Sequence, residues 1–190
     1  MKYRRINLFG GPGVGKSICA AKLFGDLKLR GYLVEQVSEY AKTWAHQKRA
    51  VDVYTQLYFL AKQIKSEREC LTSGYDLIVT DSPLGLCPLY TSEYFPKDAG
   101  WSTSSMWGYI RAMDEEYPPL NILISRDETV DYERNGRYQN ITEARKIDDK
   151  LIKISKMFGG FSTDKSYTVN RYNELLSYVE SKLRGEQLCS

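Results

Sequence analysis

Residues 10–17 read GGPGVGKS, which fits the phosphate-binding pattern G-x-x-x-x-G-K-[ST]. The apolar segment at 3–9 predicts a short buried strand before this motif, and residues 17–29 predict a helix after it. A glycine-rich loop between a strand and a helix N-terminus is the context in which this pattern binds phosphate. The motif therefore indicates an α/β fold with a phosphate ligand. Its members are Gly10, Gly11, Pro12, Gly13, Val14, Gly15, Lys16 and Ser17.

The residue types in this loop suit a nucleoside triphosphate. Glycines let successive backbone N–H groups approach a β-phosphate, and the helix N-terminus adds partial positive charge. We expect Lys16 to reach the β- and γ-phosphates and the Ser17 hydroxyl to bind Mg²⁺. The alternative, a glycine-rich turn with a chance lysine, is disfavoured by the flanking strand and helix. The dinucleotide pattern G-x-G-x-x-G does not fit, because Pro12 or Lys16 falls where glycine is required.

Composition is typical of one globular domain, which we expect to cover residues 1–190. The chain has 190 residues, of which 42% are apolar and 27% charged, so disordered and fibrous classes are excluded. The apolar run near the N-terminus is too short for a signal peptide, and no segment is long enough to span a membrane. We therefore expect no membrane partner and a cytoplasmic location. Four scattered cysteines and one histidine disfavour a zinc site.

Charge is unevenly distributed along the chain, whose net charge is +3. Residues 1–70 contain 13 Lys/Arg and 6 Asp/Glu, whereas residues 71–190 contain 14 and 18. The basic half includes the phosphate-binding loop, so part of the excess serves a triphosphate. The remainder suits attraction of a polyanion, although a solvated helix face also explains much of it.

Strand and helix patterns alternate along the chain. This alternation predicts a five-stranded parallel sheet with helices on both faces. The expected strands are 3–9, 32–38, 77–81, 120–125 and 167–169, and the expected helices are 17–29, 52–71, 142–158 and 172–183.

The segment at 84–117 is longer than a crossover requires, and it is rich in aromatic residues. We expect a helix at 107–117 and a loop at 96–105. In such a fold this insertion lies on the side of the acceptor substrate, where aromatic faces can stack on bases. Trp44 could extend this wall, and Gln56 and Gln63 are candidate partners for a base edge. The alternative is that the rings form core or oligomer contacts. They are Tyr90, Tyr94, Phe95, Trp101, Trp107, Tyr109 and Tyr117.

Two carboxylates follow predicted strands. Asp81 ends the strand at 77–81, where a second Mg²⁺-binding carboxylate belongs, although a strand-end aspartate also caps turns. Glu39 follows the strand at 32–38, and the carboxyl ends of parallel strands meet at one crevice. A carboxylate there can accept a proton from an attacking hydroxyl, and Lys42 could neutralise the transferring phosphoryl group. Both Glu39 and Lys42 could instead be ordinary residues at a helix start.

Three arginines follow the strand at 120–125. Arg126, Arg134 and Arg137 lie in or beside a segment, 126–141, that could close over the phosphates as a lid. Such arginines stabilise charge in a phosphoryl-transfer transition state. The alternative is that the acidic residues between them simply form ion pairs with them.

Together these motifs resemble a group of bacteriophage P-loop proteins related to thymidylate and nucleoside kinases. Within that group the chain is similar to the phage kinases that phosphorylate 5-hydroxymethyluracil bases in DNA. One departure concerns Ser82 and Pro83, which follow Asp81 where thymidylate kinases carry an Asp-Arg pair. This departure disfavours a nucleoside monophosphate as acceptor. The motifs are at 6–9 leading into the loop, 39–42, 80–84, 135–137 and 142–145.

The resemblance implies that residues 10–17 bind ATP and that Asp81 binds Mg²⁺ with Ser17. It predicts an ATP-dependent kinase that phosphorylates the 5-hydroxymethyl group of 5-hydroxymethyluracil in phage DNA, during thymidine hypermodification in the cytoplasm of an infected host cell. The aromatic insertion and the basic first half fit a base flipped from a DNA strand. The alternatives are a kinase of free nucleosides or deoxynucleoside monophosphates and, less favoured, a regulatory P-loop ATPase.

Overall fold

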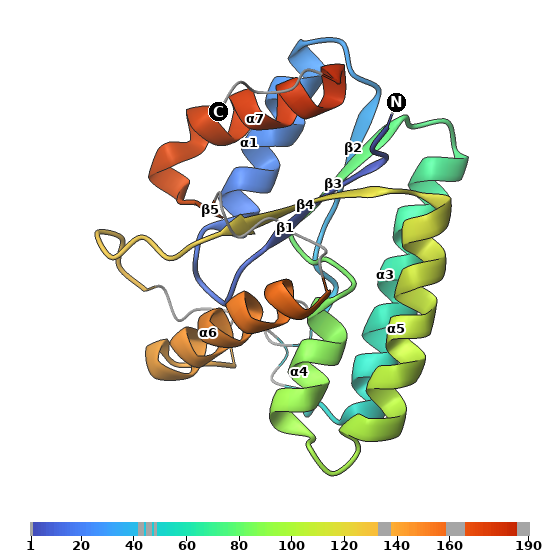
Figure 1. The fold of residues 1–190 in the computed structure, drawn as a ribbon, viewed down its shortest axis with the longest axis vertical. Helices are drawn as coiled ribbons and strands as arrows, with labels where there is room; N and C mark the ends of the chain where they lie inside the picture. The colour runs from blue at the N-terminus through green and yellow to red at the C-terminus, as the bar shows by residue number, and fades with distance from the viewer. Residues whose placement is uncertain are drawn as a thin grey trace.

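Five strands form one parallel sheet in the part of the chain that the structure describes (Figure 1). The computed structural model describes residues 2–41, 44, 47, 49–132, 138–158 and 166–185. The sheet order is β2-β3-β1-β4-β5, and every neighbouring pair is parallel. This sheet confirms the predicted architecture. The strands are β1 (Arg5–Phe9), β2 (Val34–Val37), β3 (Leu77–Thr80), β4 (Pro119–Ile124) and β5 (Ser166–Tyr167).

Helices cover both faces of the sheet (Figure 1). On one face α1 (Lys16–Leu29) and α7 (Tyr172–Arg184) bury the larger apolar cluster, and on the other α3 (Val53–Thr72) and α5 (Ala99–Glu116) bury a second. Near the carboxyl ends of β1 and β4, α4 (Leu86–Tyr94) and α6 (Ile141–Phe158) enclose a third. Within the described residues, no helix has the length and apolar character needed to cross a bilayer.

Every residue of the central strands β1 and β3 is buried, including the polar residues Arg5, Asn7 and Thr80. Burial on both faces is typical of strands inside a parallel sheet that is covered by helices. Strand β1 lies between β3 and β4: the chain runs from β1 to β2 on one side of β1, and later passes from β3 to β4 on its other side. A crevice opens at the carboxyl end of the strands at such a switch point. The loop at 10–15 that connects β1 to α1 therefore lies at the position where this class of sheet binds ligands.

The aromatic insertion at 84–117 contains two helices that pack together, α4 and α5. The predicted helix at 107–117 is confirmed as part of α5, whereas the predicted loop at 96–105 is wrong from residue 99 onward. Helix α5 begins at Ala99, and Ser102, Met106, Ile110 and Met113 form its buried stripe. Its first turns are rich in serine, threonine and glycine, which intrinsically favour helices little. Burial of the stripe against α4 and α3 overrides this propensity. The hydroxyl groups at 102–105 donate to carbonyl groups four residues earlier, so none competes with the helix.

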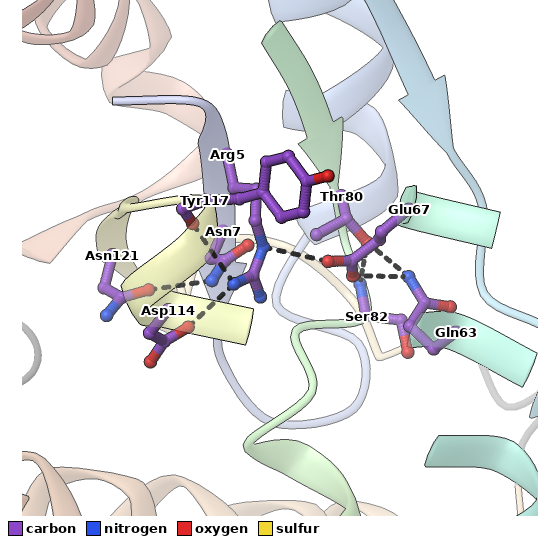
Figure 2. A network of polar contacts seen from close by, with 9 residues as sticks. All are labelled: Arg5, Asn7, Gln63, Glu67, Thr80, Ser82, Asp114, Tyr117 and Asn121. Carbon is purple, nitrogen blue, oxygen red and sulfur yellow. Dashed lines mark hydrogen bonds and ion pairs between the residues drawn. The ribbon is translucent and has the colours of Figure 1, made fainter. Parts of the chain in front are cut away.

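A buried ion pair crosses the interface between the sheet and α3 (Figure 2). Arg5 Nε lies 2.9 Å from Glu67 Oε2, and Arg5 Nη1 donates to Asp114 Oδ1 at 2.7 Å. The side chains of Arg5 and Glu67 are 1% and 0% exposed. Burial raises the pKa of the Glu67 carboxyl group, and the neighbouring Arg5 opposes this rise. Each group is thus the principal compensation for the other's lost hydration.

Replacing Glu67 with leucine should therefore lower the free energy of unfolding by about 3–5 kcal/mol, because Arg5 keeps its charge in the interior and loses its fully buried carboxylate partner, leaving the partly exposed Asp114. Chemical denaturation followed by circular dichroism measures this loss. Glu69→Leu is the matched control, since Glu69 lies on the same helix but its ion pair with Lys65 is more than 60% exposed. We expect the control to change stability by less than about 1 kcal/mol. Equal losses in the two variants would contradict the importance of the buried pair.

Candidate functional site

The loop at 10–15 has the backbone conformation that its glycines allow. Gly13 and Gly15 have φ angles of 78° and 91°, in the left-handed region that disfavours other residues. The Lys16 side chain folds back over the loop, and its Nζ donates to the carbonyl oxygens of Gly10 and Gly11 at 2.8 Å each. Helix α1 begins at Lys16, so its first N–H groups face the loop. These features form an anion-binding cradle.

Gly13 is required by its neighbour as well as by its backbone. A Cβ atom on Gly13 would lie 2.5 Å from the ring of Tyr132, well inside van der Waals contact. The hydroxyl of Tyr132 donates to the Gln139 carbonyl at 2.9 Å, which fixes the ring beside the loop. The segment that follows β4 therefore packs directly on the phosphate-binding loop.

The two predicted magnesium ligands meet at the loop. The Ser17 hydroxyl donates to Asp81 Oδ2, although the residues are 64 apart in sequence. Asp81 is 5% exposed, and its Oδ1 atom is buried without a hydrogen-bond partner among the described residues. Burial of such an oxygen atom costs free energy unless a cation or a hydrogen-bond donor binds it. A hydroxyl and one carboxylate fit Mg²⁺, which is commonly held by one or two carboxylates together with substrate phosphates.

Among the described residues, no group of three or more His, Cys, Asp and Glu side chains is placed to hold a metal ion. A metal bound at Ser17 and Asp81 would therefore depend on phosphate oxygens and water for its remaining ligands. This arrangement matches an ion that arrives with a nucleotide.

Glu39 and the phosphate-binding loop line one cavity of about 680 Å³. Val37 and Thr80, the last residues of β2 and β3, are paired in the sheet. Glu39 comes shortly after β2 and Asp81 directly after β3, so both residues follow the ends of adjacent strands. The charge of Glu39 is felt across the cavity, since burial and then the Glu39 carboxylate raise the pKa of the Tyr90 hydroxyl well above its usual value. The structure thus brings Glu39 to the same space as Lys16.

One part of the cavity wall is largely aromatic and apolar. It is formed by α3, α4 and the turn after α4, which supply Gln56, Phe59, Leu86, Tyr90, Tyr94 and Phe95. Tyr90 and Tyr94 stack with ring centroids 6.1 Å apart. Trp44 packs edge-on against Phe59 at 5.3 Å and does not line the cavity itself.

The other predicted rings lie elsewhere. Trp107 and Tyr117 pack in the core between the sheet, α3 and α5. Trp101 and Tyr109 are 53% and 64% exposed and do not line the cavity. The alternative that the rings are core residues therefore holds for Trp107 and Tyr117, whereas Trp101 and Tyr109 lie at the surface.

The two candidate glutamines have different environments. Gln56 is 7% exposed and lines the cavity, and within the described residues its carboxamide has no hydrogen bond. Gln63, two helical turns later, points into the core and donates to Glu67 Oε1 and Thr80 Oγ1 at 3.1 Å each (Figure 2). Of these two glutamines, only Gln56 lines the cavity and is placed to contact a ligand there.

Arg126 lies against the phosphate-binding loop. Its Nη2 donates to the Pro12 carbonyl at 2.8 Å, and its Nε pairs with Asp148 at 2.8 Å. Its partner is thus on α6 and is none of the acidic residues beside it in sequence. The other lid candidates, Arg134 and Arg137, lie outside the described residues, as does Lys42.

The sequence interpretation missed Asp148. Its carboxylate accepts a hydrogen bond from the Gly11 N–H, and burial raises its pKa while Arg126 opposes the rise. Ala144, Ile147 and Leu151 are buried residues of α6. Asp148 follows Ile147 directly and lies one helical turn from each of the other two. An acidic residue at the edge of an apolar helix stripe is a signal that could have identified it.

Replacing Gly13 with alanine should reduce affinity for a non-hydrolysable ATP analogue at least tenfold, because Cβ would meet the Tyr132 ring and a positive φ would be strained. Isothermal titration calorimetry measures this affinity. The control is Gly25→Ala in α1, where the added Cβ meets nothing within 4 Å. The control should bind normally and be about 1 kcal/mol more stable. Unchanged affinity of Gly13→Ala would show that the loop tolerates another conformation.

Comparison with known proteins identifies the fold. No model of a protein family matches the chain, and no curated protein sequence does. Among solved structures, NadR in complex with NR matches all of this chain with a TM-score of 0.65 at 15% identity. A second NadR structure, with NAD and AMP-PNP, gives 0.63 at 12%.

The chain spans only about half of these NadR chains, 54% and 51%. Deoxyadenosine kinase from M. mycoides, with dCMP and dCDP bound, is matched over 99% of its length and 95% of this chain, with a TM-score of 0.60 at 16% identity. The sheet order, the phosphate-binding loop and these likenesses show that the chain has a P-loop kinase fold.

Proposed function

We propose that this protein is an ATP- and Mg²⁺-dependent phosphotransferase that acts on a hydroxyl group of a nucleoside-type acceptor. One observation carries the proposal. The phosphate-binding loop with Lys16 and Ser17 lines the same cavity as Glu39 and a set of apolar and aromatic side chains. A donor phosphate and an acceptor hydroxyl could meet there.

The donor side binds and orients the triphosphate. Lys16 Nζ donates to the carbonyl oxygens of Gly10 and Gly11, so its ammonium group lies at the loop, where it could bind the β- and γ-phosphates. Ser17 and Asp81 would hold Mg²⁺, which when bound neutralises charge on the phosphate oxygens. The arginine lid, with Arg126, Arg134 and Arg137 as its candidates, would add positive charge around the transferring group.

The acceptor side positions a hydroxyl and removes its proton. Glu39 is half-buried at the cavity wall, beyond the end of β2. We assign it the role of general base, which accepts the hydroxyl proton as the oxygen attacks the γ-phosphorus in line with the departing ADP. Exclusion of water by the aromatic wall would favour transfer over hydrolysis.

The shape and chemistry of the wall suit a nucleobase. Phe59, Tyr90 and Phe95 offer apolar surface for a planar ring. Gln56 adds one donor and one acceptor in a largely dry environment, which is the pattern that reads a base edge. That NadR was solved with NR, and the M. mycoides enzyme with dCMP, agrees with an acceptor of this class.

Two sources of such an acceptor fit the proposal. The resemblance to phage kinases and the basic first half favour the 5-hydroxymethyl group of 5-hydroxymethyluracil in DNA, with the base flipped into the cavity. The solved neighbours favour a free nucleoside or nucleotide. We propose the DNA base as the specific acceptor and retain the free nucleoside as the alternative.

An acceptor screen separates these sources. With γ-labelled ATP and Mg²⁺, the purified protein should label hydroxymethyluracil-containing DNA, and Gln56→Leu should lower kcat/KM for the acceptor at least tenfold while leaving ATP affinity unchanged. Unmodified DNA is the negative control. Label on free nucleosides or monophosphates alone would overturn the DNA assignment and keep the kinase. ATP hydrolysis that no acceptor changes would overturn both.

The Glu39→Gln variant tests the general base. It should lower kcat for transfer by about 10²–10⁴-fold and leave affinity for a non-hydrolysable ATP analogue intact, because the amide keeps the shape but accepts no proton. Lys16→Ala should abolish transfer through loss of the phosphate contact. Rapid-quench kinetics of labelled ATP measures both. A Glu39→Gln variant with a near-normal rate would remove Glu39 from this role.

A further inference from the structure

The residues on both sides of Asp81 converge on one hydroxyl group. Thr80 Oγ1 accepts a hydrogen bond from the Ser82 backbone N–H at 3.1 Å and another from Gln63 Nε2 at 3.1 Å (Figure 2). The first contact closes a tight turn that has Asp81 at its centre. The second ties this turn to α3. The backbone that carries the Asp81 carboxylate is therefore fixed from both sides.

Gln63 is itself held by the buried ion pair. The same Nε2 group donates to Glu67 Oε1 at 3.1 Å, and Glu67 Oε2 lies 2.9 Å from Arg5 Nε (Figure 2). Thr80 and Glu67 are fully buried, and Gln63 is 4% exposed. Water cannot easily reach these buried side chains to replace a lost hydrogen-bond partner. Each contact in the network therefore depends on the precise position of its two partners.

We propose that Gln63 and Thr80 are positioning residues for the magnesium-binding carboxylate of Asp81. This inference rests on the metal role that the proposed function gives to Ser17 and Asp81. Mg²⁺ demands near-ideal octahedral geometry, so a small displacement of one carboxylate weakens its binding. Neither Gln63 nor Thr80 lines the cavity, and their influence on the metal would pass through the turn at 80–82.

The Thr80→Val variant isolates this role. Valine keeps the volume and the branched Cβ that the strand favours, but it offers no acceptor to the Ser82 N–H or to Gln63. The Thr80→Ser variant keeps the hydroxyl oxygen and should rescue the effect. Gln63→Met, which preserves length and volume, loses the contact from the other side and provides a second test if Thr80→Val folds poorly.

The readout is the affinity of a non-hydrolysable ATP analogue, measured by calorimetry in excess Mg²⁺ and in EDTA. The wild-type protein should bind more tightly with Mg²⁺. Loss of hydrogen-bonded support around a metal ligand typically lowers metal affinity by 10–100-fold. Thr80→Val and Gln63→Met should therefore require at least about tenfold more Mg²⁺ to reach the same increase in affinity for the ATP analogue. Their affinity for the analogue in EDTA should be unchanged.

The control for general destabilisation is Asn121→Ala. It removes a hydrogen bond of 2.9 Å from Asn7 Nδ2 to Asn121 Oδ1, which joins β1 to β4 (Figure 2). Asn7 is paired with Thr80 in the sheet, but the substituted residue Asn121 lies on β4, on the side of β1 opposite to β3 and Asp81. This variant should lose thermal stability but keep the wild-type Mg²⁺ dependence. A similar shift in Asn121→Ala, or an unshifted Thr80→Val, would overturn the positioning role. A wild-type protein that binds the analogue equally with Mg²⁺ and EDTA would instead contradict the metal in the proposed function.

Discussion

The hydrogen bond from Ser17 to Asp81 is the contact on which the rest of the site depends. It joins the first turn of α1 to the end of β3, two elements that meet only because β1 and β3 are neighbours in the sheet. The parallel order places every strand end on one edge, so the loop after β1, the carboxylate after β3 and Glu39 after β2 share one crevice. Sheet topology thus does the work of assembling residues that are far apart in sequence.

Beneath this edge, a group of buried polar side chains interrupts the otherwise apolar interior between the sheet and α3. Arg5, Glu67, Gln63 and Thr80 form a continuous set of contacts from β1 to β3. Taking two charges out of water is costly, and apolar residues of similar size often stabilise a fold equally well. A set of polar contacts also fixes the relative orientation of the side chains, because hydrogen bonds have preferred angles and dispersion contacts do not. The network ends beside Asp81, the carboxylate to which we assign Mg²⁺ binding.

The sequence predicted the parts of the structure that obey short, strongly patterned rules. The motif at 10–17, the apolar runs of β1, β3 and β4, and the adjacent Asp81 were sufficient to predict the sheet and the fold class, which the comparisons confirm. The glycine- and serine-rich start of α5 could not be predicted, because tertiary burial decides it against local propensity.

The long-range pairings were equally hidden from sequence. The acidic residues next to Arg126 suggested local ion pairs, yet its partner is Asp148 on α6, 22 residues later. Gln56 and Gln63 looked equivalent, and only the rotation of α3 against the sheet distinguishes a cavity residue from a core residue. The roles of Glu39, Asp81 and the arginines in catalysis stay predictions.

The internal contacts of Lys16 have a consequence for ligand choice. The ammonium group is already solvated by two carbonyl oxygens of its own loop, so an incoming anion must replace these interactions before it gains anything. An isolated orthophosphate reaches few of the surrounding amides and recovers little of that loss, whereas an extended polyphosphate spans the cradle and recovers it several times over. Under the proposed function, these two internal contacts would therefore favour an extended polyphosphate over a small anion at the cradle.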